Sequence, residues 1–331
     1  MLRERGHTLV GVDTGFFVAE DGETAAPASD GGTHRLDVRR MGPELLQGID
    51  AVIHLAALSN DPMGELDPAL TDAINHRASV RLARMAREAG VERFVFASSC
   101  SLYGAADSKG VLDESAPFNP VTAYARSKVD AEAGLAELAA ADFAPVFLRA
   151  GTVYGLSPAM RFDLVANNLV GWALTTGRIH LESDGSPWRP LVHVEDLARA
   201  YVAAVEAPRE TVANQAFNVG RDDQNFQVRD IADTVRAAVA GCGLEMAPNA
   251  GPDTRSYRVS FRKAEETLPG FEVRWTLEKG VRQMVGALGQ RRLTREEFLG
   301  PRYIRLVRLR RLRESGRLSD ELYWSTAGSR V

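Results

Sequence analysis

The stretch RFVFASSCSLYG, residues 93–104, carries most of the information about the fold of this chain. Its first seven residues form a run of mostly apolar, β-favouring side chains, which indicates a strand covered on both faces. Three serines cluster where the run ends. Shortly downstream, AYARSKVDAE (residues 123–132) has helical spacing and carries Tyr124 and Lys128 four positions apart, so both side chains lie on one face of the expected helix.

Similar short apolar runs recur along the first 150 residues and alternate with helical patterns. Strands are expected at 9–12, 34–38, 51–57 and 144–150, and helices at 68–90 and 123–141. Alternation at this spacing predicts an α/β fold with a parallel sheet wound on both faces. Farther along we expect a helix over 162–177, a loop over 184–190, a helix over 194–206 and a strand over 215–220 that returns to the sheet.

The composition is that of a globular protein. The chain has 331 residues, is 45% hydrophobic and 25% charged, and has a net charge of -4, which favours neither nucleic acid nor a membrane surface as a partner. Two cysteines, Cys100 and Cys242, are too few for a disulfide framework, and no apolar run approaches the roughly 20 residues of a membrane span. We therefore expect a cytoplasmic protein. The six histidines lack metal-binding spacing, so no metal site is predicted.

The pair formed by Tyr124 and Lys128 has a physical rationale as an acid–base unit. A phenol with a pKa near 10 must reach about 7 to act as a base at neutral pH, which takes about 4 kcal/mol. A lysine ammonium about 5 Å away supplies about 3 kcal/mol at an effective dielectric of about 20. Ser99 ends the preceding strand, where ligands bind in a doubly wound sheet, and is expected to hydrogen-bond a substrate hydroxyl. Taken alone, this spacing also occurs by chance on exposed helices.

Seven segments together resemble a known family: GVD, LDVRR, VIHLAALS, SSCSLYG, YARSK, LRAGTVYG and PWRPLVHVEDLARA. From residue 1 to about residue 290, the chain is similar to the extended short-chain dehydrogenase/reductases, above all the NAD-dependent nucleotide-sugar epimerases and dehydratases. The resemblance implies a Rossmann-type, doubly wound parallel sheet with a smaller mixed α/β C-terminal substrate domain. The expected NAD-binding domain is 1–150 plus about 191–220, and the expected sugar-nucleotide-binding domain is 151–190 plus 221–331.

The resemblance also implies roles for individual residues. The catalytic residues would be Ser99, Tyr124 and Lys128. The residues expected at the cofactor, besides Tyr124 and Lys128, are Asp13 on the adenosine ribose, Asp37 and Val38 near the adenine, Leu55, Ala56 and Ala57 along the pyrophosphate and ribose, and Asn75 behind the active site. The residues expected at the substrate are Ser101, Thr152, Asn168, Arg189 and Arg255, with both arginines facing the diphosphate.

NAD is the expected cofactor. A carboxylate at position 13 accepts hydrogen bonds from the ribose hydroxyls and repels a 2'-phosphate. Thr14 follows it, with no arginine beside it. The expected partner is a nucleotide-diphosphate sugar, and the resemblance implies a homodimer formed through the helices at 68–90 and 123–141.

Two positions bear on the reaction that the resemblance implies. Family dehydratases follow the catalytic hydroxyl with an Asp–Glu pair, whereas this chain has Cys100 and Ser101, and its Ser-x-Ser pattern resembles the 4-epimerases. Epimerisation at C4 through a transient 4-keto sugar, with Tyr124 as acid and base, is the leading hypothesis. Thr152 departs from the Asn of epimerases, and Asn168 or its neighbour could substitute. The alternatives are an NAD(P)H-dependent 4-keto-sugar reductase or dehydratase and, in another class, a non-catalytic sugar-nucleotide- or dinucleotide-binding relative.

The two ends of the chain carry further expectations. The family has a first strand and a glycine-rich loop ahead of its GVD segment, and this chain starts inside the helix that follows them. We therefore expect an N-terminally incomplete sheet with two unpaired strand edges. A start codon assigned too late is the simplest hypothesis, and weak NAD binding is expected if the chain begins at Met1. At the other end, the basic segment 302–318 carries an apolar stripe, which favours a solvated helix face over a nucleic-acid site.

Overall fold

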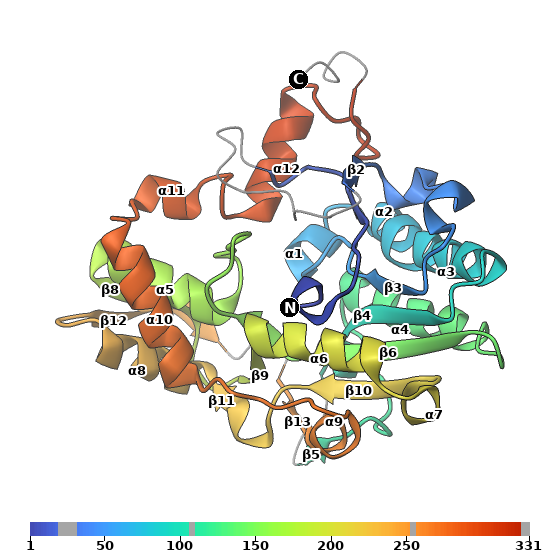
Figure 1. Cartoon of the computed structure of the whole chain (residues 1–331). Helices are drawn as coiled ribbons and strands as arrows, with labels where there is room; N and C mark the ends of the chain where they lie inside the picture. The colour runs from blue at the N-terminus through green and yellow to red at the C-terminus, as the bar shows by residue number, and fades with distance from the viewer. Residues whose placement is uncertain (19–31, 106–109, 252–255, 326–331) are drawn as a thin grey trace.

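The computed structural model describes residues 1–18, 32–105, 110–251 and 256–325, and the structural statements below concern these residues. At its centre lie four parallel strands, β3 (Ala51–His54), β4 (Arg93–Ser99), β6 (Ala144–Ala150) and β10 (Gln215–Val219). They are hydrogen-bonded in the order β10–β6–β4–β3 (Figure 1). The bounds of β4 and β6 are those predicted, and β10 returns to the sheet as expected.

Both faces of this sheet are covered by helices. On β4, Phe94 and Phe96 pack into a core shared with α3 (Ala78–Glu88) and α4 (Ala123–Ala136). The intervening Val95 enters a second core with α6 (Val194–Glu206) and α9 (Arg262–Thr267). Every residue of β6 is buried, which explains why these strands are apolar without alternation. The predicted α/β fold with a doubly wound parallel sheet is confirmed.

Several predicted helices are present but divided or shortened. The helix expected at 68–90 is formed by α2 (Pro68–Asp72), a π-helical turn (Ala73–Arg77) and α3. The helix expected at 123–141 ends as α4 at Ala136, and the one expected at 162–177 is α5 (Val165–Thr176). The remaining short elements near the sheet are α1 (Asp61–Gly64), α7 (Arg209–Val212) and the strand pair β5 (Val111–Leu112) with β13 (Arg258–Val259).

The N-terminal region forms a separate two-stranded parallel sheet. β1 (Gly11–Asp13) pairs with β2 (Thr33–Arg35), and within the described residues neither strand is hydrogen-bonded to the central sheet. Both strands are shorter than predicted. Asp37 is not in β2, because its carboxylate accepts the Arg39 N–H and caps a 3₁₀ helix (Val38–Arg40). The last helical turns expected near Met1 are instead a 3₁₀ turn (Arg3–Arg5).

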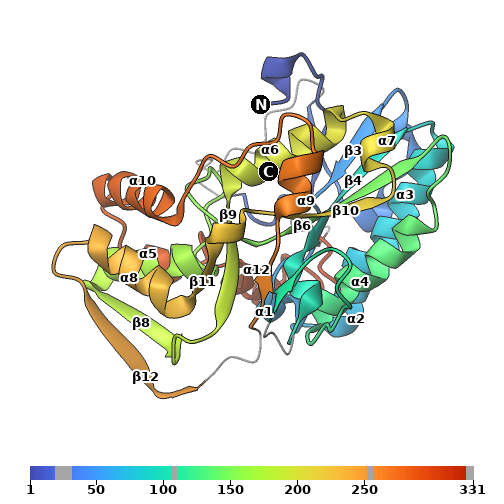
Figure 2. The same ribbon diagram turned by 90° about the horizontal axis from the view of Figure 1, so that it is seen from below.

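A second lobe lies beside the central sheet (Figure 2). It contains one sheet of β7 (Thr152–Tyr154), β9 (Trp188–His193) and β11 (Asn225–Gln227), and another of β8 (Arg178–Ser183) and β12 (Gly243–Gly251). Around them pack α5, α8 (Val228–Ala238), α10 (Leu277–Gln290) and α11 (Arg295–Leu299). The loop predicted at 184–190 becomes strand from Trp188 onward, because β9 pairs with both β7 and β11.

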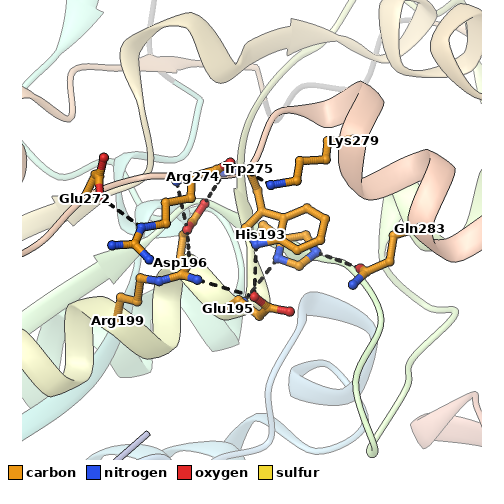
Figure 3. A network of polar contacts seen from close by, with 9 residues as sticks. All are labelled: His193, Glu195, Asp196, Arg199, Glu272, Arg274, Trp275, Lys279 and Gln283. Carbon is orange, nitrogen blue, oxygen red and sulfur yellow. Dashed lines mark hydrogen bonds and ion pairs between the residues drawn. The ribbon is translucent and has the colours of Figure 1, made fainter.

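A polar network at the start of α6 ties the two lobes together (Figure 3). The fully buried carboxylate of Asp196 accepts the backbone N–H groups of Arg274 and Trp275, at 3.1 and 3.0 Å. The ring of His193 stacks on Trp275 with centroids 3.9 Å apart, and Glu195 accepts the indole N–H. These contacts fix the linker that precedes α10 against α6. The polar residues of the HVEDLARA segment therefore have a structural role.

The C-terminal segment packs back onto the N-terminal region. We call residues 304–325 the C-terminal clasp; it contains α12 (Arg305–Glu314). Leu309 and Leu312 of α12 are buried against Phe16 and Met63, and α12 contacts α1. Figure 1 shows α12 close to β2 and α1. The predicted helix with an apolar stripe is confirmed, and its stripe is buried in this contact.

Two further sequence predictions concern cysteines and membrane spans. Cys100 and Cys242 are both buried and unpaired, as expected. In the part of the chain that the structure describes, every helix is too short or too polar to cross a lipid bilayer.

Candidate active site

A cavity of about 780 Å³ opens beyond the carboxyl ends of β3, β4 and β6. This is the edge at which open parallel sheets bind ligands. Its walls include the catalytic candidates Ser99, Tyr124 and Lys128, together with residues of the second lobe such as Thr152 and Arg189. The cavity therefore lies where the two lobes meet.

The three catalytic candidates converge on this cavity. Ser99 ends β4 in an extended conformation, and its hydroxyl accepts the Ser101 N–H at 3.2 Å. α4 begins directly after Thr122, whose hydroxyl accepts the Ala125 N–H at 3.1 Å and so caps the helix. Tyr124, on the first turn of α4, also lines the cavity, and the Ser99 side chain acts to lower the pKa of its phenol. The predicted juxtaposition of strand end and helix is present.

Lys128 lies one turn farther along α4 and is buried. Its ammonium donates to the Ala97 carbonyl at 2.7 Å and lies 5.7 Å from the centroid of the Tyr124 ring. Burial lowers the pKa of Lys128 to about 7 and raises the pKa of Tyr124 to about 12. The lowered phenol pKa expected from the sequence is therefore not produced by the protein groups alone, because desolvation is the largest influence on the pKa of both side chains.

Two buried arrangements support the catalytic candidates from behind. Arg149 of β6 forms a bidentate ion pair with Glu132 of α4, with a shortest N–O distance of 2.6 Å. Asn75 accepts the Leu58 N–H at 2.8 Å and donates to the Ser127 hydroxyl at 3.1 Å. Asn75 thus connects the loop after β3 to α4.

The cofactor candidates are only partly brought together. Leu55 and Ala57 line the cavity, and Ala56 lies between them. Asp13 is exposed at the tip of β1 and accepts the Gly15 N–H at 2.6 Å. The residues expected near the adenine lie outside the cavity lining: Asp37 is paired with Arg39 at 2.7 Å, and Val38 is buried in the core beneath α3.

Four of the five substrate candidates line the cavity: Ser101, Thr152, Asn168 and Arg189. The Ser101 hydroxyl is buried and has no hydrogen-bond partner among the described residues, as is typical of a group that awaits a ligand. Asn168 donates to the Phe162 carbonyl at 2.9 Å, and Arg189 donates to the Trp188 carbonyl at 2.9 Å. Arg255 lies outside the described residues.

Sequence reasoning missed several cavity residues that belong to no motif. Arg161 and Asp163 form an ion pair at 2.8 Å in the loop before α5, and Arg305 reaches the cavity from α12. Asp61 and Tyr257 complete this set, and Asp61 accepts a hydrogen bond from Thr122 at 2.8 Å. The only signal was the charged pair in the RFD segment at 161–163. Contacts between distant loops leave no local pattern.

One group of possible metal ligands occurs away from this cavity. Asp72, His76 and Asp130 present ligand atoms within 4.8 Å of one another, although the histidine spacing did not indicate them. Asp72 is already paired with His76 at 2.8 Å and with Arg77 at 2.7 Å. His76 and Arg77 thus account for the contacts of the Asp72 carboxylate, and exposed acidic groups are common without a metal ion.

Comparisons with known proteins agree with this geometry. The model of the NAD dependent epimerase/dehydratase family matches residues 1–220. A UDP-glucose 4-epimerase from Mycolicibacterium smegmatis is 30% identical over 245 residues, covering 71% of this chain and 75% of the relative. One from Corynebacterium glutamicum is 27% identical over 295 residues, covering 84% and 86%.

A solved structure, MoeE5 in complex with UDP-glucuronic acid and NAD, is 28% identical with a TM-score of 0.73, covering 88% of this chain and 94% of that one. The predicted family, Rossmann-type fold and NAD dependence are confirmed. The chain is an enzyme-family member with an α/β architecture and belongs to the NAD dependent epimerase/dehydratase family, which acts on nucleotide sugars.

Proposed function

We propose that this protein epimerises a nucleotide-linked sugar at C4 through a transient 4-keto sugar. The observation that carries the proposal is the convergence of Ser99 and Tyr124 on the cavity wall, with Lys128 one helical turn behind. Tyr124 removes the proton of the C4 hydroxyl as the sugar is oxidised and returns it after the keto sugar has turned in the cavity. Ser99 holds the hydroxyl oxygen during both transfers.

The residues present fit a bound dinucleotide. Leu55 and Ala57 give an uncharged wall at the carboxyl end of β3, and Leu55 is 59% exposed, as expected of a side chain that a ligand covers. The unpartnered Ser101 hydroxyl faces the same cavity. When bound, NAD supplies a reversible hydride acceptor and a positively charged ring.

The electrostatic requirement on Tyr124 can be stated as a magnitude. Lowering its pKa from about 12 to about 7 takes about 7 kcal/mol. A protonated Lys128 near the phenol contributes about 3 kcal/mol, and a phenolate one turn away in turn favours the ammonium form. A second positive charge close to the phenol must supply the remaining ~4 kcal/mol. The oxidised cofactor is the group in this family that carries such a charge.

The residues after Ser99 favour epimerisation over dehydration. Cys100 is buried, its thiol donates to the Arg149 carbonyl at 3.2 Å, and burial raises the pKa of that thiol. Ser101 faces the cavity but has no titratable group. Neither side chain can act as the acid and base pair that removes water from the sugar.

The test is incubation of the protein with UDP-glucose in D₂O without added cofactor, followed by NMR of the sugar. We expect interconversion with the C4 epimer and retention of the substrate hydrogen at C4. A requirement for stoichiometric NADPH would instead indicate the reductase, and solvent deuterium in the sugar would indicate a dehydratase. If all UDP-, dTDP- and GDP-sugars bind without turnover, the non-catalytic alternative replaces the proposal.

We also propose the domain division 1–150 plus about 191–220 against 151–190 plus 221–331. The second lobe has an apolar core of its own, although α9 and the C-terminal clasp pack against the first lobe.

A homodimer through the helices at 68–90 and 123–141, inferred from family resemblance, is a further proposal. Light scattering coupled to size-exclusion chromatography measures the mass, and a monomer at micromolar concentration would contradict the dimer.

A further inference from the structure

The C-terminal clasp contributes one side chain to the cavity, Arg305 at the start of α12. Its guanidinium lies over the ring of Phe17, with 4.6 Å to the centroid, and donates to the Ser59 hydroxyl at 3.4 Å. Ser59 follows β3, and Phe17 follows β1. Arg305 is thus situated between the ends of two strands that belong to the separate sheets.

A second guanidinium meets Arg305 at Ser59. Arg161 donates to the Ser59 hydroxyl at 3.0 Å and to its carbonyl at 2.9 Å. Arg161 also engages both oxygens of Asp163, at 2.8 and 3.0 Å. The cations of Arg161 and Arg305 therefore line this part of the wall together with the Asp163 carboxylate, which is already paired with Arg161.

The charge of Arg305 lacks a direct counter-ion. Within the described residues, no carboxylate lies at ion-pair distance from it, and its contacts are Ser59 and the Phe17 ring. Burial and then the neighbouring Arg161 lower the pKa of Arg305 to about 9, although the more distant carboxylates of Asp163 and Asp13 act to raise it, so the group is still protonated at neutral pH. A buried cation beside another cation is stabilised when an anion binds between them.

The position of the two arginines selects the kind of anion. They lie in the cavity that holds Tyr124, yet on the side of Phe17 and the β1 tip, where Asp13 is expected to meet the adenosine ribose. The substrate candidates Arg189 and Thr152 come from the other lobe. An anion at Arg305 thus falls between an adenosine and the reacting centre, which is where a dinucleotide carries its diphosphate.

We propose that Arg305 of the C-terminal clasp binds the diphosphate of the dinucleotide cofactor. A guanidinium fork suits diphosphate oxygens because it can donate two parallel hydrogen bonds. Arg305 lies outside residues 1–220, which the family model matches, so the clasp adds a binding group from another part of the chain. The inference rests on NAD dependence, not on the position at which the sugar reacts.

The test is isothermal titration of the full-length protein with NAD, ADP-ribose and UDP-glucose. For Arg305→Ala we expect NAD and ADP-ribose to bind at least about tenfold more weakly, with UDP-glucose affinity unchanged. Arg305→Lys keeps the charge without the fork, so we expect about a threefold loss. Arg310→Ala is the matched control, since Arg310 is exposed on the same helix.

Three results would overturn the inference: unchanged NAD and ADP-ribose affinities in Arg305→Ala, a loss confined to UDP-glucose, or no binding of ADP-ribose by the unmodified protein. The loss confined to UDP-glucose would assign Arg305 to the diphosphate of the sugar nucleotide. If Arg305→Ala does not fold, Arg305→Lys tests the inference instead. Its loss of NAD and ADP-ribose affinity is then compared with any loss of UDP-glucose affinity. All of these measurements are binding constants, so they test the role of Arg305 whether or not the protein epimerises the sugar at C4.

Discussion

The part of the cavity wall that carries Ser99, Tyr124 and Lys128, which we call the catalytic wall, and the C-terminal clasp border the same cavity but are built differently. Ser99, Tyr124 and Lys128 come from β4 and α4, which are close in sequence and which local patterns define. The clasp brings together residues from opposite ends of the chain, as in the hydrogen bond from Arg308 to the Phe16 carbonyl, 292 positions apart. The candidate catalytic groups are thus positioned by local structure, whereas the proposed cofactor contact of Arg305 depends on a long-range contact.

The forces that hold the two regions also differ. Behind the catalytic wall, a buried ion pair between Arg149 and Glu132 locks α4 to β6. The clasp is held by an apolar cluster and by guanidinium groups stacked on aromatic rings, such as Arg35 over Trp324 at 4.2 Å. The two regions can therefore be perturbed separately.

The largest expected effect is on the catalytic wall. Tyr124→Phe removes the phenol proposed to carry the proton, so we expect turnover to fall by about 10⁴-fold, or ~5 kcal/mol of transition-state stabilisation. NAD affinity should stay within about twofold, since the ring is retained. Steady-state kinetics and titration measure the two quantities. Residual activity within tenfold of the unmodified enzyme would remove Tyr124 from its proposed role.

The second largest expected effect concerns the buried ion pair between Arg149 and Glu132. Glu132→Ala leaves the Arg149 guanidinium buried without its carboxylate, and we expect a loss of about 4 kcal/mol in the free energy of unfolding. Urea denaturation measures it, with the exposed Arg126→Ala on the same helix as control. The double variant Glu132→Gln with Arg149→Met should recover much of the loss. Equal stabilities of Glu132→Ala and the control would contradict this role.

A third variant separates the clasp from the rest of the molecule. Leu309→Ala creates a cavity in the cluster that holds α12 against Phe16 and Met63, with an expected cost of about 3 kcal/mol. We expect early proteolytic cleavage of the clasp and weaker NAD binding. Val307→Ala, at a position that is 37% exposed on the same helix, is the control. If both variants resist proteolysis equally, the clasp is not held by its apolar face.

The same contrast explains what the sequence could predict. β4, β6 and α6 occupy the residues expected, because each is a continuous apolar or helical pattern between clear boundaries. β1 and β2 are shorter than expected, because a strand's extent depends on its neighbours and these two pair only with each other in the described residues. Local patterning thus predicts an element only where its partners are present.

The candidate site residues likewise fall into those that a local sequence pattern predicts and those that it does not. The positions of Ser99, Tyr124 and Lys128 followed from a strand end and a helical repeat. Arg161 and Arg305 were missed, because a guanidinium that reaches a cavity from another lobe or from the chain terminus leaves no spacing to detect. Likewise, the shift of the Tyr124 pKa to about 12 depends on burial, which the sequence does not contain.

The smallest effect concerns pH. In the folded protein the pKa of Lys128 is lowered from 10.5 to about 7, chiefly by burial. Between these values the unfolded chain binds a proton that the folded chain does not, so the free energy of unfolding rises with pH, by at most about 1.4 kcal/mol per unit. Lys128→Met removes this contribution and should flatten the profile from pH 7 to 9.

Neighbouring groups do not obscure this measurement. Burial lowers the pKa of His54 to about 3 and raises the pKa of Tyr124 to about 12, so neither group titrates in that window. Urea denaturation without ligand at three pH values gives the slopes, with the exposed Lys279→Met as the control. Parallel profiles for Lys128→Met and the unmodified protein would mean that Lys128 keeps its proton on folding. The ammonium would then already be available to Tyr124 before any cofactor binds.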